Sequence, residues 1–103
     1  MPNDTHAAIY SAITAYLKAM AAAGTEDATT VMKAIHAMPV NDVFAKNGKV
    51  RRDGMMVVDR YLVRAKKPAQ SRGGWDELEI VRTIPAAQGF RPLSDHACPL
   101  LKA

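Results

Sequence analysis

The three histidines and the single cysteine are the side chains best suited to metal binding or nucleophilic chemistry. His6, His36 and His96 fall on three different predicted segments, and no two of them have the i, i+4 spacing that places a pair of zinc ligands on one helical face. Cys98 lies between Ala97 and Pro99, with no histidine or positive charge directly beside it to favour its thiolate. The sequence therefore predicts packing or surface roles for these residues, with no metal site, no cofactor and no enzymatic activity.

Three acidic residues and a glycine pair are the other patterns that could do chemistry. Asp76, Glu77 and Glu79 could supply paired carboxylates for acid–base catalysis, but strand alternation places Glu77 and Glu79 together on one polar face. Gly73-Gly74 lacks both the lysine of a phosphate-binding loop and the spacing of a dinucleotide-binding fingerprint. A solvated strand face and a flexible connector explain these residues.

Positive charge is concentrated in residues 46–72, which carry nine Lys and Arg residues and two Asp in a chain of net charge +4. Such a block can bind nucleic acid, with Tyr61 as a stacking aromatic residue. It can equally be a solvated strand edge that lysine and arginine protect from aggregation. The few aromatic residues in the block favour the solvated edge, and a small nucleic-acid-binding module that uses this hairpin is the alternative.

Two amphipathic helices must hold the amino-terminal residues in place. The first is predicted over about residues 3–23, with Asn3, Asp4 or Thr5 as its cap and Gly24 at its end. Its apolar residues recur at helical spacing and form one stripe: Ile9, Ile13, Leu17 and Met20, with Tyr16 beside it. The second is predicted to begin at a Thr25 cap and to end before Pro39, with Val31, Ile35 and Met38 on its inner face.

After Pro39 the apolar period changes from about 3.6 to 2, which predicts strands. Residues 49–51 and 55–66 flank Asp53-Gly54, a dipeptide suited to a tight hairpin turn. A further strand is predicted over residues 75–84, with Leu78, Ile80 and Ile84 on the face opposite the two glutamates, and an irregular tail follows. With 103 residues, at most one domain is expected, and no apolar run approaches the roughly 20 residues that cross a membrane.

Short sequence words follow one another in a fixed order along nearly the whole chain. They are Pro2-Asn3-Asp4, Tyr10-Ser11-Ala12, Met38-Pro39, Asn41-Asp42 with Phe44, Tyr61-Leu62-Val63, Gly74-Trp75-Asp76, Thr83-Ile84-Pro85, Phe90-Arg91-Pro92-Leu93 and Cys98-Pro99-Leu100. Taken together, they resemble the late portion of branched-chain amino acid type ABC transporter periplasmic substrate-binding proteins.

This resemblance implies an α/β fold of the type I periplasmic-binding kind, in which two lobes close on a small solute and deliver it to an ABC permease. The chain would form a single partial domain over residues 1–103, which as an isolated piece is α+β. Residues 1–39 would be a helical pair of one lobe, residues 40–85 the hairpin and strand with the inter-lobe crossover, and residues 86–103 an irregular tail. The location would be periplasmic, although no export signal is recognised before the first helix.

By the same resemblance, the start of the first helix faces the ligand cleft, which makes Asp4 and His6 the candidates for its edge. Helix capping and surface exposure are the alternative roles for these two residues. The expected ligand is an amino acid or a related small hydrophobic or aromatic acid, and nucleic acid is not an expected partner. Because the parallel sheets of such a lobe lie outside these 103 residues, we expect either a compact rearranged packing of the helices on the hairpin or self-association through the exposed helix faces.

Overall fold

The computed structural model describes residues 3–95 and 99–101. Helix α1 (Asp4–Ala23) begins and ends where the sequence predicts. The side chain of Asn3 caps it by accepting a hydrogen bond from the backbone N–H of His6 at 3.1 Å. Gly24 closes it with a φ of 63°, in the left-handed region that glycine enters without steric cost.

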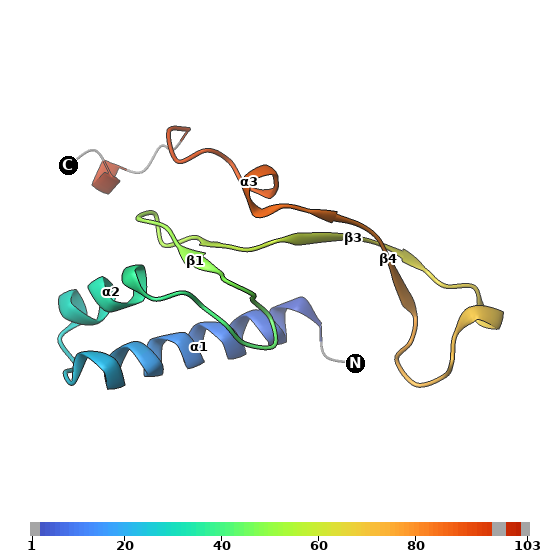
Figure 1. Ribbon diagram of the computed structural model, residues 1–103, viewed down its shortest axis with the longest axis horizontal. Coiled ribbons are helices and arrows are strands. Elements are labelled where there is room, and N and C mark those ends of the chain that lie inside the picture. Colours follow the sequence, from blue (N-terminus) through green and yellow to red (C-terminus); the bar gives the residue numbers. More distant parts are fainter. Residues whose placement is uncertain (1–2, 96–98, 102–103) are drawn as a thin grey trace.

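Helix α2 (Ala28–Ala37) folds back along α1 to make a helical hairpin (Figure 1). The predicted Thr25 cap is wrong, because Asp27 occupies that position and its carboxylate accepts the backbone N–H of Thr30 at 3.0 Å. Thr25 instead accepts the N–H of Asp27 at 3.1 Å and so shapes the connection between the helices. Val31 is fully buried, which confirms it as a residue of the inner face of α2.

The predicted hairpin forms, but its longer arm is divided. Strand β1 (Lys49–Val50) pairs antiparallel with β2 (Met56–Val57) around a turn in which Gly54 has a φ of 78°. Strand β3 (Arg60–Ala65) leaves this pair and joins β4 (Leu78–Ile84) in a second antiparallel pair. The chain switches partner at residues 58–59, where Val58 turns into the core.

A register shift in the second pair corrects the predicted face of β4. Leu62 pairs with Arg82, whereas its neighbour Val63 pairs with Ile80, so Val81 is an extra residue in β4. Side chains beyond the bulge therefore change face. Ile84 lies opposite Arg60 on the face that also carries Glu79, and it does not share a face with Leu78 and Ile80 as the alternation predicts.

The tail is more regular than predicted, since Ala86–Gly89 forms the short helix α3 and Pro99–Leu101 the 3-10 helix η2. A further 3-10 helix, η1 (Pro68–Gln70), lies in the long connection between β3 and β4. The small core gathers between α1 and the segment that follows α2. Its members are Val40, Ala45 and Val58, with Ala15, Phe44, Val50, Met56 and Phe90 packed against them.

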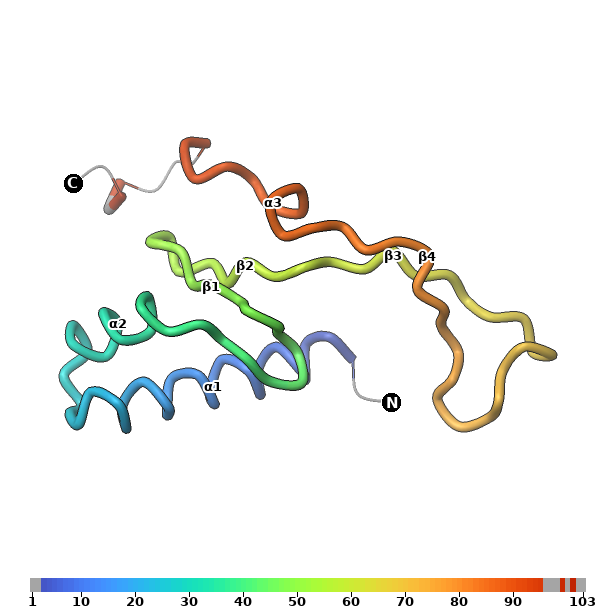
Figure 2. The backbone as a smooth tube through the Cα atoms, viewed as in Figure 1, coloured from blue at the N-terminus to red at the C-terminus, as the bar shows by residue number. Residues whose placement is uncertain are grey.

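The molecule is elongated, measuring 53 × 32 × 18 Å, and the β3–β4 arm extends away from the helical part (Figure 2). Its radius of gyration is 16.9 Å, whereas a compact domain of 100 residues has a value of about 13 Å. The expected compact rearrangement of the helices on the hairpin is therefore wrong. The apolar stripe of α1 stays exposed, with Ile9, Ile13 and Leu17 each more than half accessible.

Candidate functional site

The two residues predicted for a cleft edge have separate positions in the structure. The ring nitrogen Nδ1 of His6 lies 2.6 Å from Oδ1 of Asn3, so the histidine side chain takes part in the cap of α1. Asp4 lies two residues earlier and lines two adjoining hollows at the start of the helix. Asp4 lines the hollows, whereas His6 does not. His6 takes part in helix capping, which the sequence analysis gave as its alternative role.

We call the two hollows together the α1 groove, and each has a volume of about 420 Å³. Four residues line both hollows: Asp4, Phe44, Val58 and Arg60. An acidic and a basic side chain thus line the same depression as an aromatic and an aliphatic side chain. Such a lining suits a small solute that carries both charge and apolar surface, which is the common composition of ligand pockets.

Contacts at the base of the β3–β4 arm position the basic side of the groove. Val58 is only 6% exposed and anchors the segment. The carboxylate of Asp59 accepts the backbone N–H of Ala86 at 2.9 Å, which ties the two sides of the arm together. The guanidinium carbon of Arg60 lies 4.8 Å from the centroid of the Phe90 ring, a cation–π distance that restricts the arginine.

The aromatic side of the groove is positioned by Asp42. Its Oδ1 accepts the backbone N–H groups of Phe44 at 2.8 Å and Ala45 at 2.9 Å, and its Oδ2 accepts the hydroxyl of Ser11 at 2.6 Å. Burial by itself raises the pKa of the Asp42 carboxyl, but these hydrogen bonds and the charge of Lys18 outweigh it and hold the pKa below its usual range. Asp42 is thus a fixed anion that orders the turn carrying Phe44.

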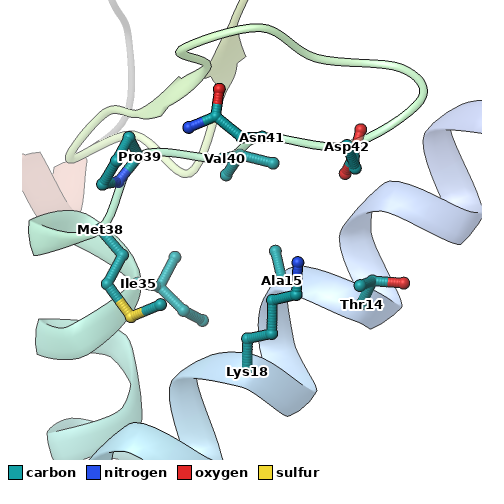
Figure 3. Close-up of a pocket in the computed structure, with 9 residues that line it drawn as sticks. All are labelled: Thr14, Ala15, Lys18, Ile35, Met38, Pro39, Val40, Asn41 and Asp42. Atoms are coloured by element: carbon teal, nitrogen blue, oxygen red, sulfur yellow. The ribbon is translucent and has the colours of Figure 1, made fainter.

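A second, smaller pocket of about 130 Å³ lies between α1, the end of α2 and residues 39–42 (Figure 3). Ala15, Ile35 and Val40 give it an apolar lining, and the amine of Lys18 extends into the space between the helices and the loop. Asp42 also borders this pocket, but its oxygens are already occupied by the three donors just described. The α1 groove therefore offers the larger space and the wider range of binding groups.

The basic block is partly neutralised by contacts within the chain. Arg51 pairs with Asp53, Arg64 with Glu79 and Lys66 with Asp76. Three of the nine Lys and Arg residues of the block are thus ion-paired, and paired cations are less available to phosphate groups.

Within residues 3–95 and 99–101, no group of three or more His, Cys, Asp and Glu residues could hold a metal ion. In the same part of the chain, no helix has the length and apolar character needed to span a bilayer. His36 contacts the carbonyl oxygen of Val50 through Nδ1 at 3.1 Å and so joins α2 to β1. His96 and Cys98 lie outside the described residues.

The sequence analysis proposed Asp4 for a cleft edge and did not single out Phe44, Val58 and Arg60, which line the same groove. In the sequence, Phe44 was noted only because it follows Asn41-Asp42 in one of the short motifs. Arg60 was noted only as one of the positive charges in residues 46–72. The partner switch after β2 brings Val58 and Arg60 to the start of α1, and no periodic pattern marks that switch.

Comparisons with known proteins agree with this architecture. The sequence profile of a family described as periplasmic binding protein matches residues 1–73. A periplasmic binding protein of Burkholderia mallei is 43% identical, with a TM-score of 0.89 over 97% of this chain and 26% of its own. A branched chain amino acid ABC transporter periplasmic ligand-binding protein of Burkholderia xenovorans is 40% identical, with a TM-score of 0.89 over 96% of this chain and 26% of its own. No curated protein sequence gives a match.

The chain thus spans about a quarter of the length of these two solved structures. Its identity to them exceeds 30% over nearly all of its residues, and the family profile covers well over half of it. The helical pair, the two antiparallel strand pairs and their arrangement are those of the corresponding part of the relatives. This chain belongs to the periplasmic binding protein family.

Proposed function

We propose that this chain supplies part of a solute-binding receptor for ABC-transporter import. The receptor captures an amino acid or a related small hydrophobic or aromatic acid without catalysing a reaction, works in the periplasm and hands the solute to a membrane permease. The α1 groove is the single observation that carries the proposal within this chain, because it joins opposite charges to an apolar floor. The relatives' description as periplasmic binding proteins, one of them for branched-chain amino acids, supports the ligand class.

In this proposal Asp4 forms part of the cleft edge, and His6 contributes by holding the start of α1 in place. Asp4 is exposed and lines the groove, where its carboxylate can receive a hydrogen-bond donor or an ammonium group of the solute. Arg60 lines the same groove and can receive a carboxylate. Phe44 and Val58 provide the apolar surface between the two charges.

The proposal is tested with a chimaera in which this sequence replaces the corresponding quarter of the Burkholderia xenovorans protein. Calorimetry with leucine, isoleucine, valine and a set of aromatic acids should show saturable binding of at least one ligand. Asp4→Asn should weaken that binding, whereas Thr29→Ala, at an exposed position of α2, should leave it unchanged. A folded chimaera that binds none of these compounds contradicts the proposal. If the Asp4→Asn variant binds as tightly as the unchanged chimaera, Asp4 is not part of the cleft edge.

The isolated chain should give no specific heat with the same compounds, because most of a two-lobed pocket lies outside it. A tight complex with the isolated chain would place a complete site within these 103 residues. The proposal of a receptor fragment would then be wrong.

A further inference from the structure

The loop between α2 and β1 contains a residue pair whose chemistry the proposed function does not use. Asn47 is exposed and is followed directly by Gly48. The side-chain amide of an asparagine is open to attack by the backbone nitrogen of the next residue, and glycine obstructs that attack least because it has no Cβ. The other two asparagines, Asn3 and Asn41, are each followed by an aspartate. Asn47-Gly48 is therefore the asparagine pair of this chain that is best suited to the reaction.

Hydrogen bonds hold the backbone of this pair in the folded loop. Gly48 donates its N–H to the carbonyl oxygen of Val40 at 2.9 Å and accepts the N–H of Val40 at 2.8 Å, which makes an antiparallel bridge. The N–H of Asn47 donates to Oδ1 of Asn41 at 2.8 Å. Asn47 has a φ of 52°, in the left-handed region. The loop thus fixes both the nitrogen that would attack and the residue that carries its target.

Packing around Gly48 adds a second restraint. The glycine is buried, and a Cβ added to it would lie 3.0 Å from Cγ1 of Val58 and 3.1 Å from Cβ of Ala45. Attack requires the nitrogen of Gly48 to give up its proton and to approach Cγ of Asn47. That nitrogen is bonded to Val40 and its residue is confined by the core, so the loop must open locally before the reaction can start.

We infer that Asn47-Gly48 is a site of spontaneous deamidation and that the Val40–Gly48 bridge controls its rate. The nitrogen of Gly48 forms a bond to Cγ of Asn47, the Cγ–Nδ2 bond breaks, and Nδ2 leaves as ammonia with the proton that Gly48 gives up. A water molecule then opens the cyclic succinimide to aspartate or isoaspartate at position 47. The reaction needs no oxidant, reductant or second protein. It is independent of the capture of any solute.

The isoaspartate product does not fit the folded loop. Its main chain runs through the former side chain and is longer by a carbon atom directly before Gly48, where Val58 and Ala45 leave no space. The bridge to Val40 should therefore break in the product, and the segment that carries Phe44 should loosen. Deamidation thus converts an opening of the loop into a permanent change of the chain.

The test is incubation of the chain at neutral pH, folded in buffer and unfolded in urea, followed by mass spectrometry of its peptides. The unfolded chain should convert Asn47 from the amide to the acid faster than Asn3 and Asn41, with release of an equal amount of ammonia. The folded chain should react at least about tenfold more slowly, because only its open form reacts. Asp53-Gly54 can form the same ring, but without a change of mass.

Two variants test the control by the loop. Asn41→Ala removes the acceptor of the Asn47 N–H and should speed the reaction of the folded chain about two- to tenfold, the change in open population that the loss of one hydrogen bond produces. Thr29→Ala, at an exposed position of α2, should leave the rate unchanged. Circular dichroism checks that both variants keep the fold.

Hydrogen exchange at the Gly48 amide gives a second measure of the same opening, because that nitrogen is the attacking atom. Low concentrations of urea should raise its exchange and the deamidation of Asn47 in proportion. The inference is overturned if the unfolded chain does not deamidate at Asn47, or if the folded chain reacts as fast as the unfolded one. It is also overturned if folded Asn41→Ala reacts at the rate of the unchanged chain, or if exchange and deamidation respond differently to urea.

Discussion

The hydroxyl of Ser11 donates a hydrogen bond of 2.6 Å to the carboxylate of Asp42, which lies 31 residues later in the chain. Ser11 is fully buried in α1, and Asp42 orders the turn that carries Phe44 into the α1 groove. One polar contact therefore connects the helix to the loop that shapes the candidate site. Both residues belong to short words on which the resemblance to the family was based, and the contact gives these words a physical role in this chain.

Ser11→Ala should lower the free energy of unfolding by about 1.5–3 kcal/mol, because it removes a hydrogen bond to a charged acceptor at a buried position. Urea denaturation followed by circular dichroism measures the change. Ser94→Ala, at an exposed hydroxyl, is the control and should shift the midpoint very little. Equal stability of the Ser11→Ala variant and the unchanged chain would mean that the contact is not formed in solution.

The lowered pKa of Asp42 makes stability depend on pH in a defined direction. The unfolded carboxyl has a pKa of about 3.9, and the folded one lies below it, so the ionised form stabilises the fold. This contribution is fully present above about pH 5 and is lost as the pH falls below about 4 towards the folded value. In Ser11→Ala, carboxyl NMR should show a raised pKa for Asp42. The pKa of Asp27, which the hydrogen bonds of Thr30 lower, should not change.

Gly48→Ala should be destabilising by about 1–3 kcal/mol, because an added Cβ would lie 3.0 Å from Cγ1 of Val58 and 3.1 Å from Cβ of Ala45 in the core. Gly89→Ala is the matched comparison. There the nearest atom is Cγ of Arg60 at 3.2 Å, on an exposed side chain that is not part of the buried core. Thermal unfolding of both variants should therefore rank Gly48→Ala as the more damaging. The reverse order would show that the packing around Val58 is looser than described.

The elements that local signals specify were predictable from the sequence. The extent of α1, the turn at Asp53-Gly54 and the stripe on α2 follow from caps, glycine and periodicity, and all three are present. The cap of α2 was misplaced because Thr25 and Asp27 are both good capping residues, and the choice depends on which one reaches a free N–H group. Local patterns alone leave that choice open.

Features that depend on partners distant in sequence were not predictable. The bulge at Val81 is set by pairing with β3, and it moves Ile84 to another face without any glycine or proline to signal it. The α1 groove joins residues 4, 44, 58 and 60 through the change of strand partner. Of these four residues the sequence analysis proposed only Asp4, because the resemblance implies that the start of the first helix faces a cleft.

Arg64→Ala should change the free energy of unfolding by less than about 1 kcal/mol, although Arg64 Nε lies 2.6 Å from Glu79 Oε1. The arginine side chain is 71% exposed, so water and salt screen the pair. Urea denaturation at low and at high salt should show a small difference that vanishes at high salt. A loss as large as that expected for Ser11→Ala would mean that the β3–β4 arm depends on this ion pair.

The chain should not retard DNA or RNA at about 150 mM salt, despite the positive charge of residues 46–72. Binding to phosphates requires cations that can replace counterions, and Arg51, Arg64 and Lys66 already face carboxylates. A gel-shift titration from about 20 to 200 mM salt provides the measurement, because genuine phosphate contacts make affinity fall steeply with salt. A triple variant provides the positive comparison. It combines Asp53→Asn, Asp76→Asn and Glu79→Gln, which removes the carboxylates from the three cations, so any weak binding of nucleic acid should increase. A steep salt dependence in the unchanged chain would instead support the nucleic-acid-binding alternative.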